Sequence, residues 1–297
     1  MDYLFKGVCT AMTTPFLQNG IDYEQFEKQI IRQLSAKIDA LVILGTTGES
    51  STVTITERKQ LVSFAKSRVK NSIPIIVGTG SNCTKTACEL TTDAKNLGAD
   101  GALVVTPYYN LCEQEGLEFH YKEVAKCKLP FIAYNVPKRT GVNILPKTAK
   151  AILTTDYAVG LKEASTDICH LNELFNVLQN EFALYCGSDN LSTLFLENGC
   201  LGTISVASNI IPFKIKEFIS NFETNYEKHN KDFRDVLSPL FNLLSSKINP
   251  IPVKCLIQIL HNEKCIFRLP LSMPNDDYFT YLTSTITSLN QNEEALC

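Results

Sequence analysis

Short apolar runs alternate with more polar stretches along the first three quarters of the chain. Residues 41–44 and 73–77 are apolar at nearly every position, which is typical of strands buried on both faces of a parallel sheet. Eight such runs recur, at residues 7–12, 40–44, 74–77, 101–105, 130–134, 158–161, 182–186 and 202–206. The pattern therefore predicts repeated strands, each enclosed by other structure.

The stretches between the runs predict helices. Thr54 and Glu57 have the spacing of a capping box at the start of residues 57–69. Residues 84–96 form a second helical stretch, which ends at Gly98. Repeated strand–helix units predict an α/β fold, a (β/α)8 TIM barrel, which typically needs about 250 residues. An open doubly wound sheet is the alternative, but residues 78–80 lack the third glycine of its nucleotide-binding fingerprint.

The strand–helix alternation stops after Asn209. Residues 215–244, 253–260 and 277–289 have helical patterns, and the prolines of residues 249–252 interrupt them. We therefore expect a catalytic barrel over residues 1–224 and a C-terminal helical region over residues 225–297.

Composition narrows the possible partners. The formal net charge is -3 over 297 residues and leaves no basic stripe, which argues against nucleic acid as a partner. The sequence has no apolar run long enough to cross a bilayer and begins without a secretory signal, so we expect a cytoplasmic protein with no membrane partner. The 11 cysteines contain no Cys-x-x-Cys pair and the four histidines are far apart, so no metal site is predicted.

One lysine is the most informative candidate for chemistry. Lys162 ends the apolar run that begins at Ala158, and in a barrel the carboxyl ends of the strands meet at one rim. An amine among apolar neighbours loses hydration, which favours its neutral form, and a neutral amine attacks a ketone to form a Schiff base. A solvated charge, or an ion pair with Glu163, is the alternative interpretation.

Other predicted strand ends carry groups that suit an acidic substrate. Thr46 and Thr47 lie in a Gly-Thr-Thr-Gly turn at the predicted start of a helix, where the amides and hydroxyls of the turn suit a carboxylate. Tyr109 and Tyr134 are phenols that can relay protons, and Arg139 can bind a carboxylate through two hydrogen bonds. Each of these residues is also compatible with an ordinary turn, packing or surface role.

Five motifs in this order resemble the dihydrodipicolinate synthase family. They are Gly45-Thr46-Thr47-Gly48-Glu49-Ser50, Thr106-Pro107-Tyr108-Tyr109, Tyr134-Asn135-Val136-Pro137-x-Arg139-Thr140-Gly141, Gly160-Leu161-Lys162-Glu163 and Asn249-Pro250-Ile251-Pro252-Val253-Lys254. The match runs from the first predicted strand into the C-terminal region. The resemblance implies condensation of pyruvate with L-aspartate 4-semialdehyde, the first committed step of diaminopimelate and lysine synthesis, without a cofactor or metal.

The resemblance also implies roles for individual residues. Lys162 would form the Schiff base, with Tyr134 as proton donor and acceptor and Thr46 and Tyr109 completing a hydroxyl relay. The pyruvate carboxylate would be bound by Thr46 and Thr47, and the carboxylate of the semialdehyde by Arg139. The backbones of two further residues would line the pocket, Gly187 and Ile204. Tyr109 would come from a neighbouring subunit, which implies a homo-oligomer, at least a dimer and commonly a tetramer.

One departure from the family concerns inhibition by lysine. The resemblance places the family's effector site at the dimer interface, near Ser50, Ser51, Asn82 and Tyr108. The carboxylate that binds the effector's ammonium in sensitive members is replaced by Thr86, beside Lys85. Because a cationic effector without a carboxylate partner binds poorly, we expect weak or absent lysine inhibition.

Two other functions remain as alternatives. N-acetylneuraminate lyases and 2-keto-3-deoxy-sugar acid aldolases share the lysine and the pyruvate half-site. They usually lack an arginine at the position of Arg139, and the sialic acid lyases tend to have serine in place of Thr46, so both residues favour the synthase. The alternative from another class is a non-catalytic protein that binds a keto acid.

Overall fold

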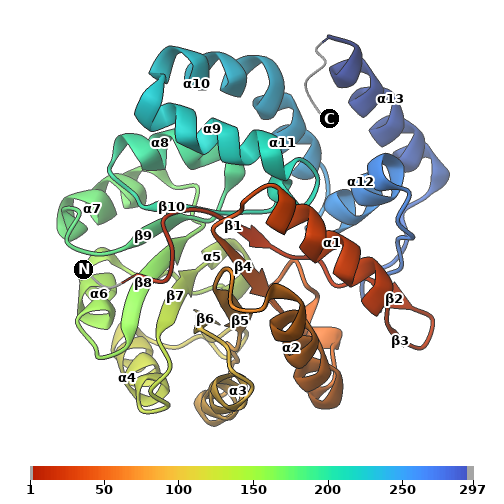
Figure 1. Ribbon diagram of the computed structural model, residues 1–297. Coiled ribbons are helices and arrows are strands. Elements are labelled where there is room, and N and C mark those ends of the chain that lie inside the picture. The colour runs from red at the N-terminus through yellow and green to blue at the C-terminus, as the bar shows by residue number, and fades with distance from the viewer. Residues whose placement is uncertain (1–2, 293–297) are drawn as a thin grey trace.

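A closed barrel of parallel strands forms the centre of the molecule (Figure 1). The computed structural model describes residues 3–292. The strands lie in the order β1-β10-β9-β8-β7-β6-β5-β4, and β1 pairs with both β10 and β4 to close the ring. Their bounds are β1 Gly7–Ala11, β4 Ala40–Ile43, β5 Ile75–Gly78, β6 Gly101–Val105, β7 Phe131–Asn135, β8 Ala158–Glu163, β9 Leu184–Cys186 and β10 Gly202–Ser205. The predicted TIM barrel is confirmed, with each strand within two residues of its predicted bounds.

Helices surround the barrel and connect its strands (Figure 1). A short hairpin, β2 Phe16–Leu17 and β3 Gly20–Ile21, precedes the first helix. The capping box predicted at Thr54 and Glu57 is present. The helices between the strands are α1 Tyr23–Ser35, α2 Ile55–Val69, α3 Thr84–Asn96, α4 Gln114–Ala125, α5 Pro137–Thr140, α6 Pro146–Leu153, α7 Ile168–Leu178 and α8 Ser192–Glu197.

Side chains alternate between the two faces of each strand, and this alternation separates the hydrophobic core into two parts. In β4, Ala40 and Val42 belong to the cluster inside the barrel, whereas Leu41 and Ile43 pack in the layer between strands and helices. Successive side chains of a strand point to opposite faces, so this division holds along every strand. The register pairs Tyr134 of β7 with Lys162 of β8. Both side chains therefore face the interior.

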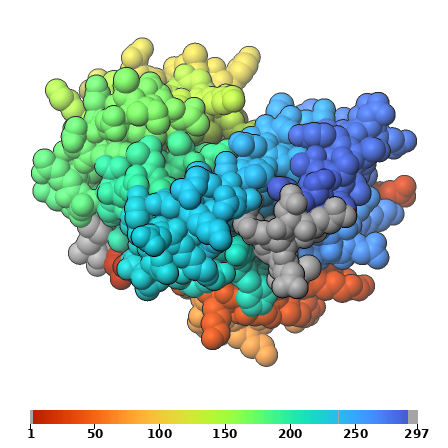
Figure 2. Space-filling view, turned by 90° about the horizontal axis from the view of Figure 1, so that it is seen from above, coloured from red at the N-terminus to blue at the C-terminus, as the bar shows by residue number. Residues whose placement is uncertain are grey.

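The C-terminal helices cover one side of the barrel, coloured cyan to blue in Figure 2. Helix α9 packs against β1 and α10, and α12 packs against α11 and α13. The stretch predicted at residues 215–244 is helical apart from a break at Asn225, whose side chain caps α10. The elements are α9 Pro212–Thr224, α10 Tyr226–Asp232, a π-helical turn at Phe233–Leu237, α11 Ser238–Leu244, α12 Ile251–His261 and α13 Asp276–Asn292.

The predicted boundary after residue 224 falls at the end of α9. The division into two regions stays a prediction, and residues 293–297 of the second region lie outside the described residues. Between residues 3 and 292, none of the helices combines the length and the apolar composition that a membrane span requires.

Candidate active site

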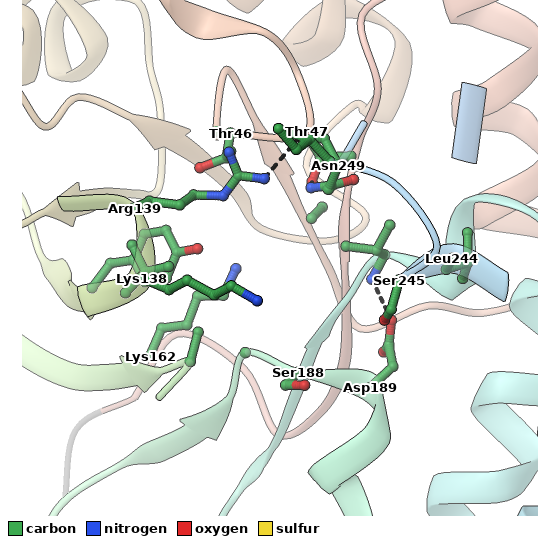
Figure 3. Close-up of a pocket in the computed structure, with 18 of the residues that line it drawn as sticks. Thr46, Thr47, Lys138, Arg139, Lys162, Ser188, Asp189, Leu244, Ser245 and Asn249 are labelled. Carbon is green, nitrogen blue, oxygen red and sulfur yellow. Dashed lines mark hydrogen bonds between the residues drawn. The ribbon is translucent and has the colours of Figure 1, made fainter. Parts of the chain in front are cut away.

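Lys162 projects into the barrel from the carboxyl end of β8. Its side chain is only 5% exposed, and its Nζ lies 4.4 Å from the centre of the Tyr134 ring. Both residues line a cavity of about 780 Å³ at the carboxyl ends of the strands (Figure 3). A cavity of this size suits a small organic ligand. The structure thus brings the candidate nucleophile and its candidate proton donor together.

Glu163 faces away from Lys162, into the layer behind the strand. Asn135 Nδ2 donates to both carboxylate oxygens of Glu163, at 3.0 and 2.8 Å, and the amide N–H of Ser165 donates to one of them at 2.6 Å. His170 Nε2 lies 3.2 Å from the same carboxylate, and this hydrogen bond raises the pKa of the imidazole. The alternative of an ion pair between Lys162 and Glu163 is therefore wrong.

These contacts form a clamp between β7 and β8, made by Asn135, Glu163 and His170. Asn135 is the register partner of Glu163, and the next pair along the same two strands is Tyr134 and Lys162. The clamp on the outer face therefore fixes the relative position of the two reactive side chains on the inner face.

The Gly-Thr-Thr-Gly turn follows β4 and reaches the same cavity. Within residues 3–292, no acceptor pairs with the amide N–H of Thr46 or Thr47. A hydrogen bond of 3.0 Å from Asn249 Nδ2 orients the Thr47 hydroxyl. Helix α2 begins only at Ile55, so the predicted helix start at this turn is wrong. The free amides and hydroxyls remain suited to a carboxylate.

A buried ion pair holds the turn in place from the C-terminal side. Lys254 of α12 contacts Glu49 at 2.5 Å and also donates to the carbonyl oxygens of Thr14 and Ile266. Both charged side chains are almost fully buried, and burial lowers the pKa of the Lys254 ammonium. Lys254 thus supports the turn through Glu49 and does not itself line the cavity, whereas Asn249 of the same motif does.

Arg139 lies on the short helix α5, immediately after β7. Its Nη2 donates to the carbonyl oxygen of Asn249 at 2.9 Å, and its side chain lines the cavity (Figure 3). The preceding residue, Lys138, points into the same cavity. The α5 segment therefore places two cations opposite the Gly-Thr-Thr-Gly turn.

Gly187 is required by the close approach of its backbone to Lys162. A Cβ atom at this position would lie 3.0 Å from Lys162 Cε and 2.9 Å from the carbonyl oxygen of Glu163. Ile204 lies inside the barrel on β10, but the cavity wall beside it is formed by Val206. Asp189 accepts hydrogen bonds from the amides of Val206 and Ala207, each at 3.0 Å. The structure therefore places Gly187, but not Ile204, in the cavity wall.

Tyr109 is not brought to the cavity of its own chain. It lies in the loop after β6 with φ of 76°, and its side chain is 90% exposed. A positive φ is rare for a tyrosine and indicates a constrained projecting position. The expectation that Tyr109 serves a neighbouring copy stays a prediction, as does weak inhibition by lysine.

Sequence reasoning missed the wall contributed by the C-terminal region. Leu244, Ser245, Lys247 and Asn249 line the cavity, more than 80 residues after Lys162 in the chain. The motif at residues 249–254 is the available signal in the sequence, but its prolines predict only a break between helices. Within residues 3–292, no group of three or more histidine, cysteine, aspartate or glutamate residues is placed to bind a metal ion.

Comparison with known proteins gives a consistent result over nearly the full chain. Residues 4–289 match the sequence model of the dihydrodipicolinate synthetase family. The chain is 45% identical to the 4-hydroxy-tetrahydrodipicolinate synthase of Alkaliphilus oremlandii (strain OhILAs) over 91% of this chain and 93% of that protein.

Solved structures agree with this match. The dihydrodipicolinate synthase from Thermotoga maritima superposes with a TM-score of 0.93 at 39% identity, covering 97% of this chain and 99% of that one. The enzyme from Acinetobacter baumannii, solved in complex with pyruvate, superposes with a TM-score of 0.91 at 36% identity, covering 96% and 99%.

Proposed function

The chain belongs to the dihydrodipicolinate synthetase family, and from that premise we propose that it condenses pyruvate with L-aspartate 4-semialdehyde to give 4-hydroxy-tetrahydrodipicolinate. One observation carries the proposal for this chain. The amine of Lys162 is buried beside the Tyr134 ring in a cavity, and Glu163 is bonded to other groups. A desolvated amine without a carboxylate partner is suited to attack a carbonyl.

The first half of the reaction activates pyruvate. Lys162 Nζ attacks C2 of pyruvate, a C=N bond forms, and water leaves with the carbonyl oxygen. A methyl proton then leaves C3, and the electron pair gives an enamine. We assign the proton transfers at this carbon and nitrogen to the Tyr134 hydroxyl, because the Tyr134 ring lies beside Lys162 Nζ. The amides and hydroxyls of Thr46 and Thr47 bind the pyruvate carboxylate.

The second half joins the two substrates and releases the enzyme. The enamine carbon attacks the aldehyde carbon of the semialdehyde, and the resulting alkoxide takes a proton. The substrate's own amine then adds to C2, the bond from C2 to Lys162 breaks, and the ring closes. Arg139 binds the carboxylate of the semialdehyde at the mouth of the cavity. The backbone of Gly187 shapes the pocket around the bound acid.

Two residues of the proposed proton relay lie at the edge of this cavity or outside it. Thr46 and Tyr109 form the proton relay from Tyr134 to water, with Tyr109 supplied by a second copy of the chain. We therefore propose that the active form is a homo-oligomer, at least a dimer. The enzyme acts in the cytoplasm, where its two substrates are metabolic intermediates.

Borohydride reduction tests the covalent step directly. The protein treated with pyruvate and borohydride should lose activity irreversibly and gain the mass of one reduced pyruvate adduct on the peptide that contains Lys162. Lys162→Ala should trap nothing, whereas Lys247→Ala, which removes another amine from the same cavity wall, should trap pyruvate normally. Trapping by the Lys162→Ala protein would refute the assignment.

A further inference from the structure

The cavity around Lys162 carries an excess of positive charge. Four cationic side chains line it, and among the described lining residues Asp189 is the one carboxylate. The cations are Lys138, Arg139, Lys162 and Lys247. Asp189 accepts hydrogen bonds from two backbone amides, so it is already engaged. Like charges gathered in a cleft concentrate the field and attract anions.

Three of these cations have identified partners or roles. Arg139 donates to the Asn249 carbonyl oxygen at 2.9 Å, and Lys247 Nζ lies 4.7 Å from the centre of the Tyr278 ring. Lys162 is the proposed nucleophile, packed against Tyr134. Lys138 differs from them, because among residues 3–292 its ammonium contacts no hydrogen-bond acceptor, carboxylate or aromatic ring, and it points into the cavity (Figure 3).

The base of the Lys138 side chain is held rigidly. Lys138 lies in α5, which begins at Pro137 directly after β7, and proline at a first helical position is pre-organised for the helix. The Thr140 hydroxyl contacts the carbonyl oxygens of Val136 and Val142, at 3.3 and 3.0 Å, and so ties the two ends of this turn. A flexible ammonium is therefore anchored at a fixed point of the rim, next to Arg139.

The substrates of the proposed reaction carry anionic groups that suit the Lys138 ammonium. Each substrate brings one carboxylate, so the product carries two, and the Thr46 and Thr47 turn accounts for only the first. We propose that Lys138, together with Arg139, binds the carboxylate of the amino-acid aldehyde and so sets the preference for an acidic second substrate. This inference rests on the proposed function and deepens it. Hydrogen bonds between charged partners are shorter and stronger than neutral ones, so the second cation adds to the first.

Steady-state kinetics with both substrates test the proposal. Lys138→Met should raise KM for aspartate semialdehyde by about ten- to a hundredfold, the usual loss for a charge-assisted hydrogen bond, and leave KM for pyruvate unchanged. Lys138→Arg should restore most of the affinity, since it retains a cation. Lys147→Met is the control: it removes the same charge from an exposed position on α6, outside the cavity lining, and KM should not change.

The outcomes separate this inference from the function on which it rests. Lys138→Met should still trap pyruvate with borohydride, because the first half-reaction does not use Lys138. An unchanged KM for the semialdehyde, or an equal rise in the Lys147→Met control, would overturn the role of Lys138. A rise in KM for pyruvate instead would overturn it too, by assigning Lys138 to the first substrate. Failure of the unaltered protein to trap pyruvate would refute the proposed function itself.

Discussion

At the residue scale, Glu49 and Lys254 illustrate how a buried charge pair supports a reactive loop. Glu49 follows directly on the turn of Thr46 and Thr47, and Lys254 reaches it from α12 at 2.5 Å. Both side chains are buried, so each charge depends on the other for solvation. Removing one partner of such a pair leaves an uncompensated charge, which is more damaging than removing both.

Lys254→Met should therefore lower the free energy of unfolding by about 3–5 kcal/mol. The double variant Glu49→Gln/Lys254→Met should lose less, because no charge is left unpaired. Denaturant unfolding of the two variants and the unaltered protein measures both quantities. Equal losses of unfolding free energy in the single and double variants would show that the unpaired Glu49 charge is not what destabilises the single variant. KM for pyruvate should rise in the single variant, because the turn that Glu49 supports is proposed to bind the pyruvate carboxylate.

At the element scale, the alignment of β7 with β8 depends on the clamp made by Asn135, Glu163 and His170. Asn135 and Glu163 share the outer face of the two strands, where His170 of α7 contacts Glu163, and Tyr134 and Lys162 share the inner face. A small shift between the strands would move the proposed proton donor relative to the amine. Misplacement of about 1 Å can reduce a rate by about a hundredfold.

Glu163→Gln should accordingly lower kcat by about ten- to a hundredfold with little change in KM for pyruvate. The amide of glutamine cannot accept on both of its terminal atoms, so at least one Asn135 contact is lost. An unchanged kcat would contradict the positioning role. Glu173→Gln, on the same helix as His170, removes a carboxylate outside the clamp and serves as the control.

The same clamp predicts a pH dependence of stability. Hydrogen bonding to Glu163 raises the pKa of His170 above its ordinary value of 6.5, so the folded protein binds this proton more tightly than the unfolded chain. The stabilisation is complete below that ordinary value and disappears as the pH rises through the raised pKa. His170→Gln should remove this slope from a plot of unfolding free energy against pH, and Glu163→Gln should bring the His170 pKa, measured by NMR, back down.

The elements themselves could largely be predicted, because local patterns determine them. Every barrel strand is an apolar run, and α3 coincides with its predicted bounds at Thr84–Asn96. The break at Asn225 escaped prediction, because the apolar pattern continues on both sides of it.

The site was only partly predictable, for a physical reason. Lys162 and Tyr134 lie at the carboxyl ends of their strands and Thr46 follows its own, so the barrel itself brings them together at one rim. Asn249 reaches Thr47 across 202 residues of chain, a contact that depends on how the C-terminal helices pack. No local spacing encodes such an approach, and the same holds for the Lys138 ammonium, which has no partner in the described part of the chain.

At the scale of the whole molecule, the site of one chain is incomplete by the proposed mechanism. Tyr109 stands 90% exposed at a strained backbone position, and it does not line its own cavity. A second copy of the chain that covers this loop would place the phenol in its own site. Activity would then depend on assembly.

Mixing two inactive variants tests this dependence. Tyr109→Phe and Lys162→Ala should each be nearly inactive alone, whereas subunit exchange between them should restore activity. In a mixed pair, one site combines the intact Lys162 of one copy with the intact Tyr109 of the other. If mass spectrometry detects mixed oligomers but activity does not recover, the site is not shared between two copies of the chain. As a control, Lys162→Ala mixed with Lys162→Arg should not recover activity.

The cavity around Lys162 combines a crowded floor with a wall contributed from elsewhere in the chain. At Gly187 even one added carbon would collide with the Lys162 side chain, whereas Lys138 and Arg139 reach the cavity from the separate helical turn α5. Covalent chemistry and the proposed choice of acceptor are thus encoded in different stretches of polypeptide. Grafting a new α5 turn onto this scaffold offers a route to carboligases that keep pyruvate as donor and accept other aldehydes.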